Sequence, residues 1–213
     1  MTATVTRAAP DVWVATGSRE LWCAGPAHAE DLAAAEPLPH PRRAEYLAGR
    51  ALLRHLLRLT VPEHADAWVR ADGHGRPFLD GAPDTGISIS HDGDTVAAAV
   101  GRRRRVGVDV QLPAQSVPDS LLRRCLGPYA EGVRALPEGQ RALELAWVWT
   151  VQEACVKAAG TGLSGSPWTI DVPPGHRRGT WGAYRWISLR DHSRTPLSCA
   201  YTRLDDARET PCF

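Results

Sequence analysis

The amino-acid composition is marked by what it lacks. Asparagine is absent, methionine occurs only at position 1, and Lys157 is the single lysine among 25 basic residues. Isoleucine is scarce while alanine, glycine, proline and arginine are abundant, which indicates a coding background that replaces lysine by arginine. A lysine that persists against this bias predicts a role that the planar, permanently charged guanidinium of arginine does not fill.

The five cysteines form neither a C-x-x-C pair nor an even disulfide framework; they lie at positions 23, 125, 155, 199 and 212. This pattern gives no support for a zinc site and favours a reducing, cytoplasmic compartment. No apolar run approaches the roughly 20 residues of a membrane span, and the first residues lack the apolar core of a signal peptide. We therefore expect a soluble cytoplasmic protein without a membrane partner.

An excess of charge of one sign is also lacking, because 25 basic residues oppose 24 acidic ones and the net charge is +1. A broad phosphate-neutralising surface for nucleic acid is therefore not expected, whereas a local basic pocket for a small polyphosphate stays open. With 43% hydrophobic residues, the chain has enough material for one compact unit or two small subdomains with a real core.

The spacing of apolar residues predicts two long helices and several short strands. An amphipathic helix is expected from about Pro41 to Thr60, and a largely buried one from about Glu138 to the stop signals Gly160 and Gly162. Residues 71–83 are expected to be loop, and 113–139 a loop-rich segment with short helical pieces. Strands are expected at 87–90, 95–100, 106–112, 180–189 and 197–204, the first three as an antiparallel meander.

Both halves of the chain thus run from a helix to strands, although no sequence repeat is legible. The predicted class is α+β: a pseudo-twofold pair of similar subdomains, each a helix packed on a small antiparallel sheet, with a cleft between them. We place the N-terminal subdomain at residues 1–106 and the C-terminal subdomain at residues 107–213. Clefts between subdomains commonly bind small ligands.

Two familiar motifs do not have their usual meaning here. The sequence GTGLSG at 160–165 matches G-x-G-x-x-G, but it follows a helix instead of a strand, which favours a helix end over a dinucleotide site. Ser90, His91 and Asp92 are adjacent at the end of a predicted strand; because neighbours in a strand point to opposite faces, they do not form a catalytic triad.

Two other segments carry charged residues within otherwise apolar elements: GVDVQ at 107–111 in a predicted strand and WTVQEACVK at 149–157 in the long helix. Alternation puts Asp109 and Gln111 on one strand face, and helical spacing stacks Glu153 and Lys157 one turn apart. A carboxylate from each element would suit a hard cation such as Mg²⁺. A Glu–Lys pair at this spacing is more often an ordinary contact of about 0.2–0.5 kcal/mol, but a carboxylate within an apolar strand demands a partner or a metal.

Four stretches stand in order along the chain: GRP at 75–77, ISH at 89–91, GVDVQ at 107–111 and WTVQEACVK at 149–157. Together they resemble the 4'-phosphopantetheinyl transferases, in the surfactin-synthetase-activating class whose single chain contains two similar halves. The resemblance runs from about Arg42 to Leu163. It implies transfer of phosphopantetheine from coenzyme A to a serine of an acyl or peptidyl carrier protein, with Mg²⁺ or Mn²⁺ on the pyrophosphate and adenosine 3',5'-bisphosphate as the second product.

The resemblance also implies roles for single residues. Asp109 and Glu153 correspond to metal ligands, Glu153 also to the base for the serine hydroxyl, and Lys157 to the residue that neutralises or protonates the departing phosphate. Contacts to the coenzyme A phosphates and adenosine are implied for Arg43, Arg50, Gly75, Arg76, Pro77, Ser90, His91 and Lys157. Residues 1–106 would then bind adenosine and phosphates, and residues 107–213 would hold the metal and the catalytic groups.

Two positions depart from the family pattern. Many relatives have an acid where Gln111 stands, and an amide still offers one oxygen to a metal but no charge. Many have lysine where Gln152 stands; helix geometry turns Gln152 about 100° from Glu153, so it is expected to miss the metal and face the substrate mouth. The segment 112–128 resembles in position the family's carrier-docking region, with a local apolar patch closing the second subdomain as the alternative.

Two further functions stay open. A fold relative weakened in catalysis would bind coenzyme A or a carrier without transfer, as Gln111 and Gln152 would allow. A metal-dependent coenzyme A phosphohydrolase would use the same metal and phosphate residues, but would also need a water-orienting group. The fused halves favour a monomer, since shorter relatives build an equivalent cleft between subunits.

Overall fold

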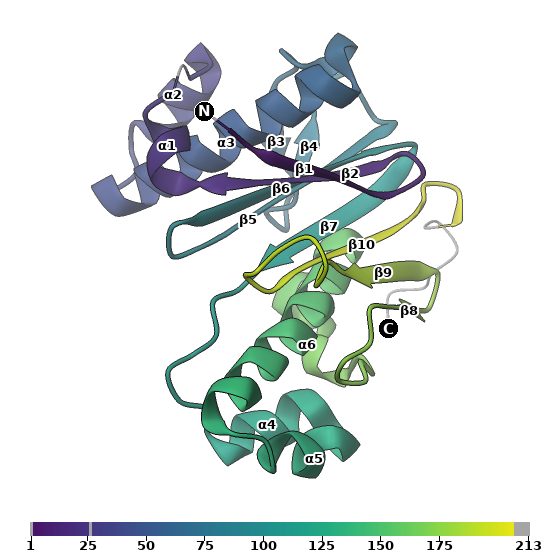
Figure 1. The fold of residues 1–213 in the computed structure, drawn as a ribbon. Coiled ribbons are helices and arrows are strands. Elements are labelled where there is room, and N and C mark those ends of the chain that lie inside the picture. The colour runs from purple at the N-terminus through teal and green to yellow at the C-terminus, as the bar shows by residue number, and fades with distance from the viewer. Residues whose placement is uncertain (1, 26, 207–213) are drawn as a thin grey trace.

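A computed structural model describes residues 2–25 and 27–206, and it contains a curled eight-stranded sheet with helices at both ends (Figure 1). The order of the strands in this sheet is β1-β2-β6-β5-β7-β10-β9-β8. Their bounds are β1 (Thr4–Ala9), β2 (Val12–Ser18), β5 (Thr85–Asp92), β6 (Thr95–Arg102), β7 (Arg104–Val110), β8 (Arg178–Trp181), β9 (Tyr184–Ser188) and β10 (Leu197–Arg203). A separate two-stranded sheet consists of β3 (Val69–Ala71) and β4 (Pro77–Leu79).

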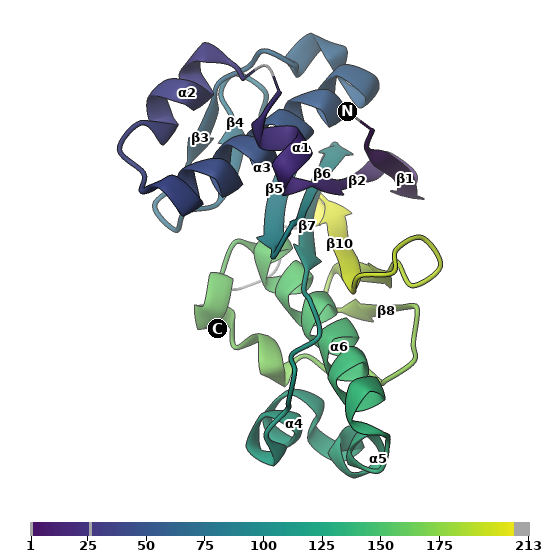
Figure 2. The ribbon, with the colours of Figure 1, turned by 60° about the vertical axis from the view of Figure 1, so that its left-hand side comes forward.

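The helices fall into two groups, one on each half of the sheet. The first group is α1 (Arg19–Cys23), α2 (Ala29–Ala35), α3 (His40–Thr60) and the 3-10 turn η1 (Pro62–His64). The second is α4 (Asp119–Leu126), η2 (Gly127–Tyr129), α5 (Ala130–Arg134), α6 (Glu138–Ala159), η3 (Gly162–Gly165) and η4 (Pro167–Thr169). Figure 2 shows the two groups separated by the central strands β5, β7 and β10.

The two long helices form where their sequences favour them. In α3, Pro41 occupies the first turn, where its missing N–H costs no hydrogen bond, and the helix stops before Pro62. In α6 the chain ends the helix at Gly160, whose left-handed backbone (φ 79°) suits a residue without a side chain. Helix α6 is buried on most of its faces, whereas α3 keeps one exposed side.

Three layers of apolar side chains hold the molecule together. Helix α3 packs through residues such as Leu52 and Leu56 on β2, β5 and β6, and α6 packs on β7, β9 and β10. On the inner face of the curled sheet, Val14 and Ala99 of the first half belong to the same cluster as Val108 and Cys199 of the second. The two halves of the sheet therefore share one apolar cluster, which fixes the position of β7 relative to both.

The α+β class and the pair of helix-on-sheet halves are confirmed, but the predicted meander is wrong. Strand β6 lies between β5 and β2, and β7 joins the opposite edge of β5 in parallel through a single bridge, Thr85 to Arg104. The chain crosses the end of β5 to get there, because Arg103 adopts a positive φ of 52° and Gly86 lets the carbonyl of Arg104 pass where a Cβ would stand 2.1 Å away.

Other sequence expectations have mixed outcomes. The long helices lie where expected, and α4, η2 and α5 are the short helical pieces expected within 113–139. The segment 71–83 is not all loop, because β3 ends at Ala71 and β4, its partner, occupies Pro77–Leu79. The strand expected at 180–189 is the hairpin β8–β9. Within residues 2–25 and 27–206, none of the helices combines the length and apolar character needed to cross a membrane.

Candidate active site

The two halves of the sheet meet at the β5–β7 seam (residues 85–92 and 104–112), where side chains replace part of the backbone ladder. Three alternate β5 side chains accept hydrogen bonds from backbone amides opposite them: Ser88 Oγ from Val108 (3.1 Å), Ser90 Oγ from Val110 (3.4 Å) and Asp92 Oδ2 from Leu112 (2.6 Å). Since β-strand side chains alternate, these three oxygens line one row. The seam thus places polar groups where the two halves touch.

Asp109 and Lys157 form an ion pair on this seam. Lys157 Nζ lies 2.6 Å from Asp109 Oδ1, and it also donates to Ser90 Oγ (3.0 Å) and the Val108 carbonyl (3.3 Å). Ser90 Oγ in turn donates to Asp109 Oδ1 at 2.8 Å. Burial raises the pKa of Asp109, although Lys157 and Ser90 stabilise its carboxylate. The demand of this buried carboxylate for a partner, expected from the sequence, is met by Lys157.

Gly107 explains how helix α6 comes close enough to the strand. A Cβ at position 107 would stand 2.1 Å from the Ala154 carbonyl and 2.5 Å from the Ala158 amide. A glycine is therefore required where β7 crosses α6, since any side chain would push the two elements apart. The close approach brings Lys157 of α6 onto Asp109 of β7.

Glu153 lies one helical turn before Lys157 and is half-buried. Its Oε1 atom is buried and has no hydrogen-bond partner within the described part of the chain. Burial raises the pKa of Glu153, the negative charge of Asp109 raises it further, and Lys157 opposes both effects. A buried carboxylate oxygen without a partner is costly, so its place in this cluster calls for a ligand that is not part of the chain.

Gln111 lies beside an acid that the sequence analysis did not select. Its Nε2 donates to Asp92 Oδ2 at 2.7 Å, and the same Oδ2 accepts the Leu112 amide. The Gln111 amide continues the ladder of β7 by donating to the Pro196 carbonyl at 3.0 Å, so Gln111 and Asp109 share the strand face that alternation predicts. The expected strand ends at residue 90, but β5 extends to include Asp92. The alternation of polar residues at 88, 90 and 92 was the signal that could have found it.

The predicted phosphate-binding residues lie partly together. A cavity of about 180 Å³ between the two halves is lined by Gly75, Arg76, Pro77, Lys157 and several neighbours. Arg76 packs against Gly160 at the end of α6, and burial together with the positive charge of Arg105 lowers the pKa of Arg76. This cavity carries positive charge from both halves, as a polyphosphate ligand would need.

The remaining predicted residues have different surroundings. His91 is exposed, with Nε2 at 3.9 Å from Glu45 of α3. Arg43 is exposed on α3, whereas Arg50 is buried, pairs with Asp31 at 3.9 Å and lies over the ring of Tyr46. Of the two arginines, only Arg43 presents its side chain to solvent.

The expectation that Gln152 faces a substrate mouth is not met. Gln152 is fully buried, and its Nε2 donates to the carbonyls of Cys125 (2.8 Å) and Ile170 (3.0 Å). It ties α6 to α4 and to the chain after η4. Gln152 does point away from Glu153, as helix geometry predicts. On that side, however, α6 is covered by α4 and by the chain after η4, so Gln152 lies in the core.

A divalent cation fits the donor set of this cluster. In the described residues no group of three or more His, Cys, Asp or Glu side chains has the arrangement of a complete metal site. Asp109 and Glu153, the latter with an unpartnered buried oxygen, lie together here, and Gln111 on the strand face of Asp109 would add an amide oxygen. Mg²⁺ commonly takes one or two carboxylates and keeps water or substrate phosphate for the rest of its shell, so an incomplete protein set suits it.

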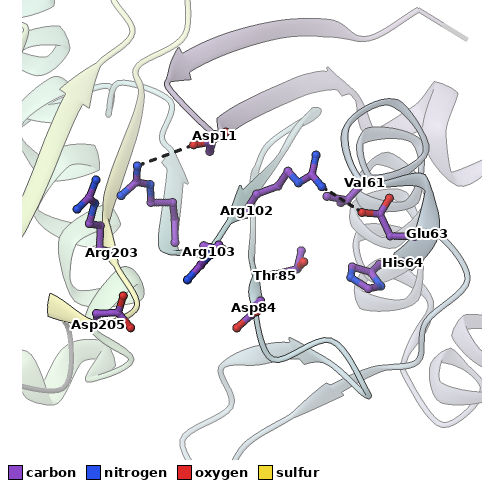
Figure 3. A pocket seen from close by; sticks show the side chains of 11 residues that line it. Asp11, Val61, Glu63, His64, Asp84, Thr85, Arg102, Arg103, Arg203 and Asp205 are labelled. Atoms are coloured by element: carbon purple, nitrogen blue, oxygen red, sulfur yellow. Dashed lines mark hydrogen bonds and ion pairs between the residues drawn. The ribbon is translucent and has the colours of Figure 1, made fainter.

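A larger cavity of about 670 Å³ lies elsewhere, around the turn between β6 and β7 (Figure 3). Its arginines face acids: Arg102 pairs with Glu63 at 3.3 Å and Arg104 with Asp11 at 3.9 Å. Arg104 begins β7 and Asp109 lies five residues further along it, roughly 16 Å away. This cavity therefore does not contribute to the Asp109 cluster, despite its size.

Two family profiles match successive parts of the chain. Residues 27–101 match the 4'-phosphopantetheinyl transferase N-terminal domain, and residues 105–203 match the 4'-phosphopantetheinyl transferase superfamily. The two segments contain the GRP and ISH stretches and the GVDVQ and WTVQEACVK stretches, respectively.

Curated relatives agree with the profiles. The chain is similar to the 4'-phosphopantetheinyl transferase AcpT of Escherichia coli O157:H7, with 35% identity over 136 residues. It is 34% identical over 134 residues to AcpT of E. coli strain K12, and 33% identical over 135 residues to that of Salmonella typhi. Each match covers 61% of this chain and 63% of the relative, which is less than two thirds of the relative's length. Together with the two profiles, these similarities show that the chain belongs to the 4'-phosphopantetheinyl transferase superfamily.

Proposed function

We propose that this protein transfers the 4'-phosphopantetheine group from coenzyme A to a serine hydroxyl of an acyl or peptidyl carrier protein. The observation that carries the proposal is the convergence of Asp109, Glu153 and Lys157 from β7 and α6 at one point of the seam. Superfamily membership makes phosphoryl-type transfer the natural chemistry for that cluster. Such transfer depends mainly on positioning and charge stabilisation, for which two carboxylates and one ammonium are suited.

The metal ligands in this proposal are Asp109, Glu153 and Gln111. Bound Mg²⁺, or Mn²⁺ in its place, would neutralise the pyrophosphate of coenzyme A and orient it. Arg76, His91, Ser90 and Arg43 would hold the phosphates, with Gly75 and Pro77 shaping the cavity wall; Arg50 would join them only by giving up its pair with Asp31.

The proton transfers are assigned to two side chains of α6. Glu153 takes the proton of the carrier serine as the serine oxygen bonds to the phosphorus of the phosphopantetheine group. The bond from that phosphorus to the bridging oxygen breaks, and adenosine 3',5'-bisphosphate leaves. Lys157 protonates the departing phosphate oxygen, and its Nζ lies at the seam where the two halves provide phosphate ligands.

We further propose that the carrier docks on residues 112–128. An apolar cavity of about 240 Å³ supports this, because it begins at Gln111 and is lined by Leu112, Val117, Leu121 and Trp149, among others. Leu112 and Leu121 are 42% and 40% exposed, so they extend the apolar lining of this cavity to the surface where a partner could cover both. The carrier serine would then reach the metal cluster directly.

Three coarser expectations belong to the same proposal. Residues 1–106 would bind adenosine and phosphates and residues 107–213 would hold the catalytic groups, a division that falls within β7. The protein would act as a monomer, because one chain supplies both walls of the cavity. It would act in the cytoplasm, as the free cysteines 23, 125, 155 and 199 favour.

The test is a transfer assay with a panel of apo carrier domains, coenzyme A and Mg²⁺, read by mass spectrometry of the carriers. We expect at least one carrier to gain a phosphopantetheine group. If none does while an established transferase modifies them all, the proposed activity is wrong. Binding of coenzyme A without product would favour a non-catalytic relative, and carrier-independent release of adenosine 3',5'-bisphosphate would favour a hydrolase.

A further inference from the structure

We propose that Asp92 is a positioning residue of the metal site, which aims the amide oxygen of Gln111 at the cation and lends the site the negative charge that glutamine lacks. The inference rests on the proposed function, because it concerns the same metal. Asp92 is not among the residues selected from the sequence motifs. Its carboxylate would supply the negative charge that the neutral Gln111 does not bring to the metal.

Asp92 sets the orientation of the Gln111 side-chain amide. Asp92 Oδ2 accepts the Gln111 side-chain nitrogen at 2.7 Å and the Leu112 backbone amide at 2.6 Å. A carboxylate accepts hydrogen bonds only, so the nitrogen of the amide must face it and the oxygen must face away. With the nitrogen held by Asp92, Oε1 is left free for a cation on the side that Gln111 shares with Asp109.

Asp92 also makes this arrangement rigid. Asp92 is the last of the three β5 side chains that accept β7 amides along the seam, after Ser88 and Ser90. Its bond to Leu112 fixes the backbone next to Gln111, while its bond to Nε2 fixes the side chain. Asp92 thus restrains both the backbone beside Gln111 and the Gln111 side chain, as hydrogen-bond partners of metal ligands usually do.

Asp92 also contributes charge. Asp109 and Glu153 provide two carboxylates, and Gln111 provides none. A charge-assisted hydrogen bond from Asp92 polarises the amide and makes its oxygen a stronger donor to a hard cation. Asp92 is also close enough to Asp109 for the two charges to interact. The pair of Asp92 and Gln111 would therefore bring both an oxygen donor and a negative charge to the metal.

The experiment measures Mn²⁺ affinity in the presence of saturating coenzyme A, by the electron paramagnetic resonance signal of free Mn²⁺. Asp92→Ala removes both bonds, and we expect it to weaken Mn²⁺ binding by roughly tenfold or more. Asp92→Asn keeps an oxygen that can accept both bonds but removes the charge, so its affinity should lie between those of wild type and Asp92→Ala.

A matched control lies on the same hairpin. Asp94 accepts hydrogen bonds from Ser18 Oγ (2.7 Å) and the Glu20 amide (3.1 Å), away from the metal ligands. Asp94→Ala therefore also loses a side-chain and a backbone partner. It should lower the thermal stability of the metal-free protein to a degree similar to Asp92→Ala, but should leave Mn²⁺ affinity unchanged.

A rescue variant separates positioning from folding. Gln111→Glu in the Asp92→Ala background restores a carboxylate at the metal without restoring the bond to Leu112, so Mn²⁺ affinity should return to at least the wild-type value. If Asp92→Ala binds Mn²⁺ as wild type does, or if Gln111→Glu fails to rescue a weakened Asp92→Ala, the positioning role is wrong. Transfer activity of the wild-type protein, measured in the same preparations, tests the proposed function independently. If wild type is active and Asp92→Ala binds Mn²⁺ as wild type does, only the role of Asp92 is refuted. If wild type is inactive, the proposed function is refuted.

Discussion

Two buried ion pairs, one in each half of the molecule, differ in how accessible they are to a ligand. In the first half, Arg54 of α3 lies 2.5 Å from Asp31 of α2, donates to the Ala65 and Ala67 carbonyls and is within 3.5 Å of Glu30. Both side chains of that pair are nearly inaccessible, at 2% and 3% exposure. The cluster is enclosed by its own protein partners.

In the second half, Lys157 and Asp109 form an equally short pair with a different character. The lysine side chain is 29% exposed and borders the cavity between the halves, and the neighbouring Glu153 keeps a buried oxygen without a partner. Both clusters bury charge at a cost in solvation. Glu30 Oε2 and Arg54 Nη2 of the first cluster also lack a hydrogen-bond partner within the described residues, but these atoms are buried away from any cavity that the structure shows there. Only the second cluster brings a partly exposed charge to the border of a cavity, and that access distinguishes a site from a structural ion pair.

The largest expected effect is on catalysis, from Glu153→Gln. The change keeps the shape of the side chain but removes its ability to take a proton, so turnover in the carrier assay should fall by a factor of about 10² to 10⁴. Because burial and Asp109 raise the pKa of Glu153, the charged carboxylate costs folding free energy above that pKa. The free energy of unfolding at neutral pH, measured without metal, should therefore stay equal or rise.

Glu138→Gln is the matched control, since Glu138 is exposed in the first turn of the same helix. It should leave turnover unchanged and lower the free energy of unfolding by no more than about 0.3–1 kcal/mol, through the lost interaction with the helix dipole. Turnover of Glu153→Gln near the wild-type value would remove Glu153 from its role as base.

Arg54→Met is expected to lower stability and to leave the metal site intact, in contrast to Glu153→Gln. Removing Arg54 leaves Asp31 with only the more distant Arg50 (3.9 Å) and takes the donor from the Ala65 and Ala67 carbonyls, which should lower the free energy of unfolding by about 3–5 kcal/mol in urea titrations. Arg102→Met is the control: Arg102 and Glu63 are about half exposed, and losing their pair should cost less than about 1 kcal/mol (Figure 3). If folded Arg54→Met loses Mn²⁺ affinity as strongly as it loses stability, the two clusters are not separate in function.

Lys157→Arg tests why this lysine persists in an arginine-rich chain. The ammonium contacts three acceptors within 3.3 Å, a compact geometry that a planar guanidinium does not reproduce, and arginine does not release a proton. We expect turnover to fall roughly tenfold or more, with a smaller change in KM for coenzyme A because the charge remains. Full turnover in this variant would show that position 157 needs charge alone.

The same comparison shows what sequence patterns could predict. Helices α3 and α6 were found because apolar spacing and terminal Pro and Gly are local signals, and Lys157 was found because the composition isolates it. The strand order was not found, because the crossing of β7 past β5 depends on the backbone at Gly86 and Arg103 and on the pairing of distant strands. Apolar alternation predicts a strand but not its neighbour.

Side-chain surroundings were predictable only in part. The shared face of Asp109 and Gln111 followed from alternation, but the partner of Gln111 did not, because Asp92 reads equally well as a turn residue in the HDGD sequence at 91–94. The prediction that Gln152 faces a substrate mouth was wrong for a related reason. Helix geometry gives its direction relative to Glu153, but α4 and the chain after η4 determine what covers that side of α6. Directions within one element are local properties, whereas burial is a property of the whole fold.

The smallest expected effect separates two serines that look alike on the seam. Ser88 and Ser90 are both buried and both accept a β7 amide, so Ser88→Ala and Ser90→Ala should each lower the free energy of unfolding by about 1 kcal/mol. Only Ser90 also contacts Asp109 and Lys157. Losing that contact should reduce turnover by a further factor of roughly five relative to Ser88→Ala, which is about 1 kcal/mol in the transition state. Equal turnover in the two variants at matched stability would mean that Ser90 only holds the strands together, and that Lys157 is positioned by Asp109 without it.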